Sequence, residues 1–401
     1  MRRSWRLPLA LVTAVVVAEA AVFAMRPRDR GPEPVPVEPR AYFSEAQIGK
    51  AEAFRSGQLW LYLAQTAIGF GVLVVIVRRP PRRLVAHRRP LLAGAAVAAA
   101  ISVTTGVAAL PLSAVARERA KDVGLVTQGW PGYAGDVVKS QAIGAGFAAL
   151  GGAALVLGMR RFGSRWWLPG AAVVVAFGAI TTYAGPVVLD PLFNDFKRLP
   201  SGALRTDVLN LARKAGVDVG DVYEVDASRR TTAANAYVTG LGATKRVVLY
   251  DTLVSDFEPA ETRLVVAHEL GHVHHRDIRN GLLWLAIVAP FGMWAASVLA
   301  QRLAPPGAEL GPSAVPAVAL SLALVVPGVT MISNQLSRDV ERRADAFSLD
   351  LTRDPQTFIA FQRRIAVKNV SDPDPPAVAR YLLGSHPSTV ERIGMAEAFE
   401  R

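Results

Sequence analysis

Residues 259–277 read PAETRLVVAHELGHVHHRD and decide how the rest of the chain is interpreted. His268 and His272 stand four positions apart, with Glu269 between them. On an α-helix this spacing is just over one turn, so both imidazoles lie on one face and can reach a single ion. A helix is favoured because Pro259 suits a first-turn position and apolar residues follow it. The stretch therefore predicts a metal-binding helix.

The HExxH pattern carries a specific chemistry. Two neutral imidazoles hold zinc, and the intervening glutamate takes a proton from the water that attacks an amide carbonyl. The alternative is simply a polar, histidine-rich end of a helix, because so short a pattern also arises by chance. A third metal ligand elsewhere in the chain decides between the two interpretations.

The chain as a whole is strongly apolar. Of its 401 residues, 51% are hydrophobic, too many for an ordinary soluble enzyme. They gather in runs of roughly 18 to 24 residues, each long enough to cross the ~30 Å hydrocarbon core as a helix. The seven predicted spans are residues 7–25, 59–77, 91–112, 142–159, 166–189, 282–300 and 314–332. We expect the first to be a retained anchor, because no clean cleavage site follows its long apolar stretch.

The net charge of +12 comes largely from arginines at the ends of the predicted spans. There they are better explained as topology signals than as a nucleic-acid-binding surface, and no nucleic acid is expected as a partner. The chain contains no cysteine, so a metal must be held by His, Asp or Glu.

Four regions follow from this pattern. Their expected bounds are 1–189 for a membrane region with five spans, 190–280 for a soluble protease part with the zinc helix, 281–333 for a two-span hairpin and 334–401 for a C-terminal protease part with the third ligand. Proline predicts that residues 26–58 form an extended linker, and residues 113–141 are expected to be a loop.

The part at 190–280 has an α+β pattern. Apolar spacing predicts a helix over 204–215, and a short strand is expected at 222–225. Residues 235–240 and 246–250 flank a turn centred on Gly242, which indicates a hairpin. We therefore expect a small antiparallel sheet directly before the zinc helix.

The third ligand is sought in the last region, because two further spans return the chain to the side of the histidines. Glu341 fits best, and Asp345 lies one turn later on the same helical face. Such a pair allows the glutamate to bind zinc while the aspartate accepts a hydrogen bond from a ligand imidazole, His268 being the candidate. The alternative is an ordinary charged helix face, since arginines stand beside both.

Five motifs in order carry a family resemblance. HELGH is preceded by NAYxxG and KRxVLYDTL and followed by SRxxExxAD and SHPxxxER, within residues 190–393. This series resembles the integral-membrane zinc proteases of the type I CAAX prenyl endopeptidase family and their HtpX-like bacterial relatives. The resemblance implies a mainly α, polytopic membrane helical protein of about seven spans with a small α+β zincin-type metalloprotease domain.

Residue by residue, the resemblance implies a gluzincin-type site for one zinc ion. Its ligands are His268, His272 and Glu341, its general base is Glu269, and Asp345 supports the ligands. Two further residues, described next, are implied to lie near the scissile bond.

Asn235 begins a predicted strand, where an exposed edge can hold an extended peptide while the amide fixes its register. His386 is expected to donate a proton or a hydrogen bond to the oxyanion that develops on the substrate carbonyl. The competing interpretations are a turn residue for Asn235 and a helix-start residue for His386. His274 and His275 are expected to be solvated or interfacial, because three ligands over two turns are too spread for one tetrahedral ion.

Two arguments disagree about which side of the membrane the site faces. Arginines at the N-terminus, at 78–89 and at 160–165 fall on the side opposite the site. The positive-inside rule makes that side cytoplasmic and the site extracytoplasmic. Family resemblance implies a cytoplasmic site, and we lean to the charges of this sequence.

The leading functional hypothesis is a zinc endopeptidase of the bacterial plasma membrane that cuts membrane-associated, lipid-linked or misfolded polypeptides. A transporter and a non-catalytic zinc-binding scaffold are the alternatives. A transporter usually buries ionisable residues within its spans, and here Glu19 is the exception in nearly charge-free spans. A scaffold has no need for Glu269.

Overall fold

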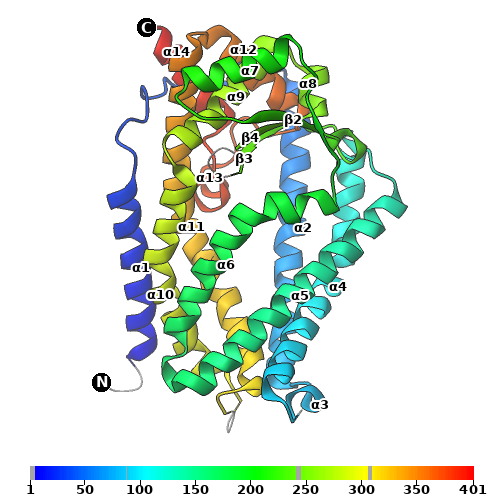
Figure 1. Ribbon diagram of the computed structural model, residues 1–401, viewed down its shortest axis with the longest axis vertical. Coiled ribbons are helices and arrows are strands. Elements are labelled where there is room, and N and C mark those ends of the chain that lie inside the picture. The colour runs from blue at the N-terminus through cyan, green and yellow to red at the C-terminus, as the bar shows by residue number, and fades with distance from the viewer. Residues whose placement is uncertain (1–4, 87, 241–244, 306–308) are drawn as a thin grey trace.

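Seven long helices form the body of the molecule in this computed structural model, which describes residues 5–86, 88–240, 245–305 and 309–401. Within these residues, 7 helices are long and apolar enough to cross a membrane, which confirms the predicted number of spans. They are α1 (Arg6–Met25), α2 (Glu45–Arg78), α4 (Pro90–Asp122), α5 (Trp130–Phe162), α6 (Trp167–Val188), α10 (Asp277–Leu303) and α11 (Val315–Thr352). The start of α1 and the short α3 (Arg82–Val85) lie at the end opposite the C-terminus (Figure 1).

Several of these helices continue well beyond the predicted spans. The expected loop at 113–141 is wrong, because α4 runs on to Asp122 and α5 already begins at Trp130. The expected linker at 26–58 is also wrong in its second half, where Ser44 caps α2 through a capping box with Gln47. The reason is the same in both places. Charged residues with good helix propensity extend a helix into water but carry no hydropathy signal.

The membrane helices pack mainly through α10 and α11. Helix α10 contacts α1, α6 and α11, while α4 lies between α2 and α5. Small residues make the close approaches, as membrane helix packing requires. Ala10 and Ala14 of α1, for example, are buried against Ala295 and Val298 of α10.

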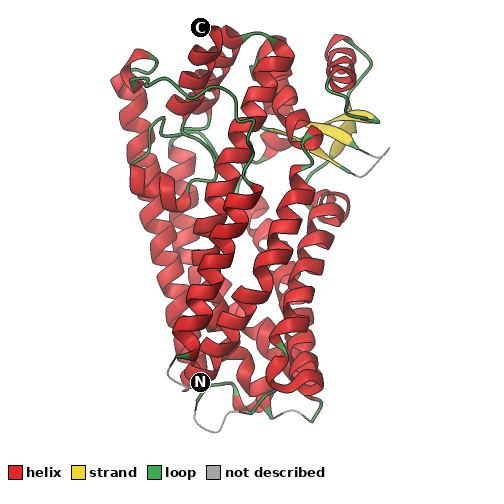
Figure 2. Cartoon of the chain, turned by 90° about the vertical axis from the view of Figure 1, so that its left-hand side faces the viewer, coloured by secondary structure: helices red, strands yellow, loops and turns green. Residues whose placement is uncertain are grey.

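A four-stranded sheet lies at the end of the bundle that carries the C-terminus (Figure 2). Its strands are β1 (Phe196–Arg198), β2 (Asp221–Val225), β3 (Ala236–Thr239) and β4 (Arg246–Tyr250), in the order β1-β2-β4-β3. The antiparallel pairing of β3 with β4 confirms the hairpin, although Gly242 itself is outside the described residues.

The expectation of a purely antiparallel sheet is wrong. Strand β2 pairs in parallel with β4, with Val222 opposite Val247, and the unpredicted β1 pairs antiparallel with β2. Local alternation of apolar residues does not encode this arrangement, because the chain passes from β2 to the edge strand β3 before it returns to the centre as β4. The order leaves β3 with one unpaired edge within the described sheet.

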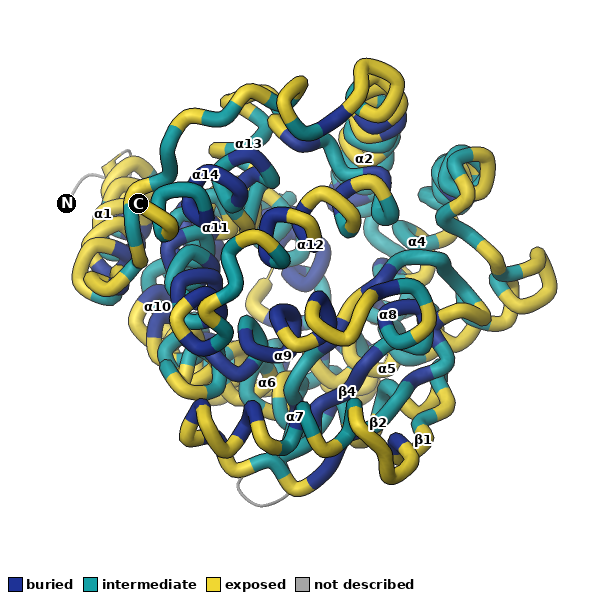
Figure 3. The backbone as a smooth tube through the Cα atoms, turned by 90° about the horizontal axis from the view of Figure 1, so that it is seen from above, coloured by how far each residue is buried: buried dark blue, intermediate teal, exposed yellow. Residues whose placement is uncertain are grey.

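Six further helices cover the sheet and the adjoining helix ends. They are α7 (Ala203–Lys214), α8 (Asp251–Asp256), α9 (Pro259–His274), α12 (Pro355–Lys368), α13 (Ala377–Leu383) and α14 (Thr389–Glu400). Helix α7 confirms the helix predicted over 204–215. Seen from above, α9 lies between α7 and α12 (Figure 3). Its Leu264, Val266 and Leu270 share a core with Val247 and Leu249 of β4, so the predicted zinc helix is fixed at the centre of this layer.

Residues 26–44, called here the strap, connect α1 to α2 across the outside of α11 and α14. The backbone N–H of Val35 donates a hydrogen bond of 3.1 Å to the carbonyl of Gly394. Gly31 has a φ of +72° and lies against Ala346, where a Cβ would come within 2.6 Å of the alanine methyl. The proline-rich strap is therefore packed against the helix that carries Glu341.

Candidate metal centre

The histidines of helix α9 face α11 because the opposite face of α9 is packed in the hydrophobic core. The helix starts at Pro259 with a capping box between Glu258 and Glu261. Leu264 and Leu270 are buried on the sheet side. His268 and His272 consequently face the helix that carries the predicted third ligand, to which α9 is closely packed.

Three of the predicted residues converge. Among the described residues, His268, His272 and Glu341 form a group whose ligand atoms all lie within 4.8 Å of one another. The two Nε2 atoms of the histidines are 3.1 Å apart. Glu341 Oε2 lies 3.2 Å from His268 Nε2, and Glu341 Oε1 lies 3.6 Å from His272 Nε2.

The hydrogen bonds behind the histidines decide what this group can hold. His268 Nδ1 is 2.9 Å from Asp345 Oδ1, and His272 Nδ1 is 2.9 Å from Asp277 Oδ2. Each imidazole therefore places its N–H at Nδ1 and turns a lone pair at Nε2 toward Glu341. Glu341 Oε2 is itself buried without a hydrogen-bond donor from the described chain.

With both imidazoles neutral, three electron-pair donors converge here, an arrangement that a shared cation stabilises. Tetrahedral ligands about 2.1 Å from zinc are roughly 3.4 Å apart, and the three separations observed lie on both sides of that value. Two imidazoles and a carboxylate are also a set that zinc prefers. The residues present therefore fit a zinc ion.

Two buried aspartate and arginine pairs orient the site. Arg392 of α14 donates from Nε to Asp345 Oδ2 at 2.8 Å, and Arg343 donates to Asp277. Each arginine thereby fixes the carboxylate that fixes a histidine, a support typical of metal sites.

Sequence reasoning gave no role to three of these four orienting residues, although signals were present. Asp277 ends the quoted HELGH stretch, and Arg392 ends the SHPxxxER motif. Arg343 carried no such signal, since it looked like one of several arginines on a charged helix face. What was missing was the tertiary contact that pairs each arginine with its aspartate.

The site is electrostatically suited to a cation. Burial lowers the pKa of His268, but Asp345 and Glu341 outweigh this effect and raise it to about 10. The same negative surroundings that hold a proton so firmly attract a divalent ion. Burial also raises the pKa of Glu269, against the opposing effect of the two histidines, which brings this carboxylate nearer to the basicity that a general base needs.

His386 lies at the edge of the group. Its Nε2 is 3.4 Å from Glu341 Oε1, and its Nδ1 is 2.9 Å from the hydroxyl of Ser385. Donation by that hydroxyl leaves the ring proton on Nε2, which faces the site. Partial burial lowers the pKa of His386, against the opposing effect of Glu341, which favours the neutral ring.

Asn235 is exposed immediately before β3, and the structure brings it into no direct contact with the three-residue group. Its carbonyl accepts a hydrogen bond of 3.0 Å from the Tyr250 N–H, and its side-chain oxygen accepts one of 2.9 Å from the Ala236 N–H. The strand it begins packs against α9. His274 and His275 remain outside the group, with His274 exposed.

Seven membrane helices, a buried HExxH helix and a carboxylate from a second helix define a membrane-embedded metalloprotease. Comparison with known families agrees. The model of peptidase family M48 matches residues 198–400, and a model described as CAAX prenyl protease N-terminal, five membrane helices, matches residues 30–195. The chain belongs to peptidase family M48.

Individual relatives point the same way. The uncharacterized metalloprotease YhfN of Bacillus subtilis is 32% identical over 307 residues, which cover 75% of this chain and 72% of that protein. CAAX prenyl protease 1 of Saccharomyces cerevisiae is 34% identical over 155 residues, covering 37% of this chain and 33% of the relative. The crystal structure of S. mikatae Ste24p has the same fold, with a TM-score of 0.77, 18% identity and 99% of both chains covered. The predicted family and fold class are therefore confirmed.

Proposed function

We propose that this chain is a zinc endopeptidase of the gluzincin type, in which His268, His272 and Glu341 bind one zinc ion and Glu269 is the general base. The observation that carries the proposal is the convergence of His268, His272 and Glu341, whose ligand atoms lie within 4.8 Å of one another, near Glu269, whose pKa is raised by burial. A zinc ion, when bound, supplies a Lewis acid that polarises the substrate carbonyl and acidifies the attacking water.

The protein residues then have distinct tasks. Glu269 takes a proton from the attacking water and passes it to the leaving amine. His386 donates from Nε2 to the oxygen that gains negative charge, for which its neutral state and its Ser385 contact prepare it. Asp345 and Asp277 hold the two ligand imidazoles in the required tautomer.

The substrate is proposed to be an extended, membrane-associated polypeptide. The unpaired edge of β3 runs beside α9 and offers backbone groups with which such a segment can pair. Asn235, at the start of that edge, fixes the register of the bound segment through its amide. Lipid-linked and misfolded membrane polypeptides both belong to this substrate class, and the name of the yeast relative, CAAX prenyl protease 1, favours the lipid-linked kind.

The molecule is proposed to divide at the bounds set out from the sequence, with residues 1–189 and 281–333 in the membrane and residues 190–280 and 334–401 forming the protease. We place it in the bacterial plasma membrane with its site on the extracytoplasmic side. The short basic loops at the far end of the bundle support this orientation.

Replacing Glu269 with Gln tests the mechanism. The amide is isosteric but cannot take a proton, so we expect Glu269→Gln to retain zinc and to hydrolyse casein or a lipopeptide about 10²- to 10⁴-fold more slowly. Metal content and initial rate are measured on the same preparation. Glu309→Gln, an exposed change at the other end of the bundle, is the matched control. Undiminished cleavage by Glu269→Gln contradicts the mechanism.

A further inference from the structure

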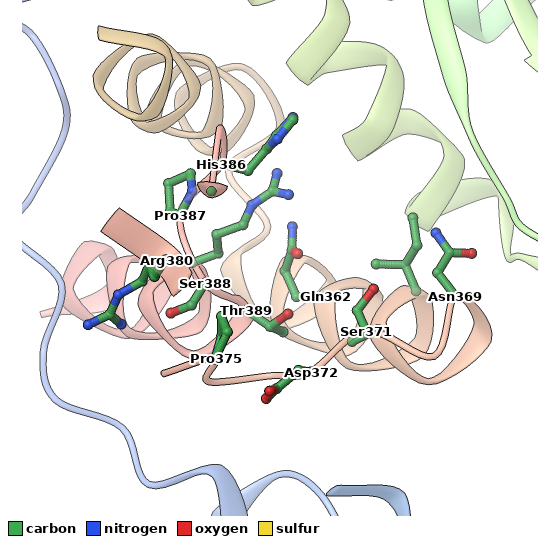
Figure 4. Close-up of a pocket in the computed structure, with 14 residues that line it drawn as sticks. Gln362, Asn369, Ser371, Asp372, Pro375, Arg380, His386, Pro387, Ser388 and Thr389 are labelled. Atoms are coloured by element: carbon green, nitrogen blue, oxygen red, sulfur yellow. The ribbon is translucent and has the colours of Figure 1, made fainter. Parts of the chain in front are cut away.

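A cavity of about 270 Å³ lies beside the metal centre, between α12, α13 and the start of α14 (Figure 4). His386 lines it at one end, with its Nε2 3.4 Å from Glu341 Oε1. At the ~30 Å³ that each molecule occupies in liquid water, the cavity has room for about nine waters. It is therefore large enough for an amino-acid side chain of a peptide that passes the metal.

The opposite end of the cavity adjoins the edge strand. Asn369 lines this end, and its side chain holds the backbone of Ala234, accepting from the N–H at 3.2 Å and donating to the carbonyl at 3.4 Å. Ala234 directly precedes Asn235 and β3. The cavity thus spans the distance between the metal centre and the start of the strand on which an extended peptide would pair.

Gln362 is the distinctive residue of this cavity. It is only 2% exposed, and its Nε2 has no hydrogen-bond partner in the described part of the chain. Its amide points into the space between His386 and Asn369 (Figure 4). A buried amide N–H left unpaired costs about 1–3 kcal/mol, so native proteins rarely retain one without a purpose.

The two arginines that line the cavity are already paired. Arg392 is paired with Asp345, and Arg380 is paired with Asp374 at 3.3 Å and with Glu391 at 3.6 Å. An acidic side chain entering the cavity would lose its hydration without gaining a free cation and would meet the carboxylate of Asp372, which also lines the cavity. A cationic side chain has no acceptor for the amide N–H of Gln362. A neutral side chain that accepts a hydrogen bond from Gln362 avoids this cost.

We propose that this cavity is the subsite for one residue that flanks the scissile bond, and that Gln362 selects an uncharged hydrogen-bond acceptor there, namely Asn, Gln, Ser or Thr. The proposal rests on the peptidase function proposed above. It assigns Gln362 to specificity and leaves the hydrolytic step to the residues already described.

The test is to profile cleavage of peptide libraries randomised on both sides of the cut bond, with zinc-loaded full-length protein in detergent. For the wild type we expect peptides with one of the four uncharged acceptors at one flanking position to be cleaved about threefold to tenfold faster than peptides with Leu or Val there. This ratio corresponds to the contribution of one hydrogen bond. Gln362→Leu should abolish that preference, keep the hydrolysis of the apolar peptides, and unfold at the same or a higher temperature. Gln356→Leu, an exposed change earlier on α12, should leave the profile unchanged.

Each other outcome counts against the proposal. If Gln362→Leu cleaves with an unaltered profile, the amide is merely hydrated and the subsite assignment falls, while the peptidase function stands. If Gln362→Leu unfolds at a lower temperature and loses activity toward all peptides equally, the residue is structural. If the wild type cleaves no peptide while containing zinc, the proposed peptidase function fails and the subsite fails with it.

Discussion

At the scale of single residues, the two histidines proposed as zinc ligands are held by equivalent hydrogen bonds from different elements. Asp345 reaches His268 from α11, whereas Asp277 reaches His272 from the first turn of α10. The contact between Asp277 and His272 depends on Arg276, which lies between α9 and α10. Its φ of 59° turns the chain, so that the first residue of α10, Asp277, lies next to His272 of α9. Both aspartates thus set the tautomer and direction of a ligand.

Replacing Asp277 with Asn should weaken zinc binding by about 10- to 100-fold, because an amide neither fixes the Nδ1–H tautomer as firmly nor raises the basicity of His272. Competition with a chelator of known affinity measures the change. Asp350→Asn, a change at an exposed aspartate of α11 that pairs with Arg353, is the control and should bind zinc as the wild type does. Equal affinities for the two variants would show that Asp277 does not support the site.

Individual residues of the site differ in how far the sequence predicts their roles. Helical periodicity alone puts His268 and His272 on one face, and it puts Asp345 one turn from Glu341. Arg392 and Asp277 could not be assigned in this way. Their roles depend on how α14 and α10 dock against α11 and α9, and no local period records that packing.

At the scale of elements, the strap links α1 to α11, the helix that carries the proposed zinc ligand Glu341, and to α14. Arg26 and Arg30 pair with Asp339 of α11 at 2.7 and 2.6 Å, and the strap backbone bonds to α14 at Gly394. Composition predicts its extended backbone, because proline at this density excludes a helix. Its packing could not be predicted, since it depends on residues about 300 positions away.

Gly394→Ala should destabilise the protein by about 1–3 kcal/mol through overpacking. The added methyl would collide with the backbone carbonyl of Val35. Because the methyl and this carbonyl are both fixed to backbone, a change of side-chain rotamer cannot relieve the collision. Thermal unfolding in detergent measures the effect. Gly49→Ala is the matched control, because it lies in helix α2 with open space around it and should stabilise by about 0.5–1 kcal/mol. A Gly394→Ala variant as stable as the wild type would mean that the strap is loosely held.

Helices α8 and α12 are joined by an ion pair whose pH dependence can be derived. Lys368 donates to Asp256, and this contact holds the Asp256 pKa below its usual value. The contribution to stability is therefore complete above the unfolded pKa of about 3.9 and is lost as the pH falls through the lower, folded pKa. Both side chains are partly exposed, so solvent screening limits it to about 0.2–1 kcal/mol.

A double-mutant cycle of Asp256→Asn and Lys368→Met measures this coupling directly. We expect a favourable coupling energy in that range at pH 7 that decreases as the pH falls below about 3.9 and disappears once Asp256 is protonated in the folded state, measured from unfolding midpoints. Each single variant serves as the control for the other, since the cycle cancels their separate effects. A coupling energy that stays constant over this pH range would contradict the assignment to Asp256.

At the scale of the whole molecule, hydropathy predicts the number of membrane helices because each crossing must be apolar over its full width. It does not predict that α2, α4 and α11 extend far beyond the bilayer as single helices. Helix α11 is the decisive case. Its apolar first part crosses the membrane and its polar last part carries Glu341 and Asp345, so one rigid element couples the bundle to the metal centre.

The orientation of this assembly is the last testable consequence. The loop joining α5 and α6 and the loop around α3 lie at the end of the bundle away from the site (Figure 1) and are rich in arginine, which favours a cytoplasmic location. Because the chain contains no cysteine, single cysteines can be introduced at two exposed serines. With an impermeant thiol reagent on intact cells, Ser201→Cys beside the sheet should be labelled, and Ser164→Cys at the far end should react only after lysis. The reverse pattern would place the metal centre in the cytoplasm and would show that the charges of these loops do not set the orientation.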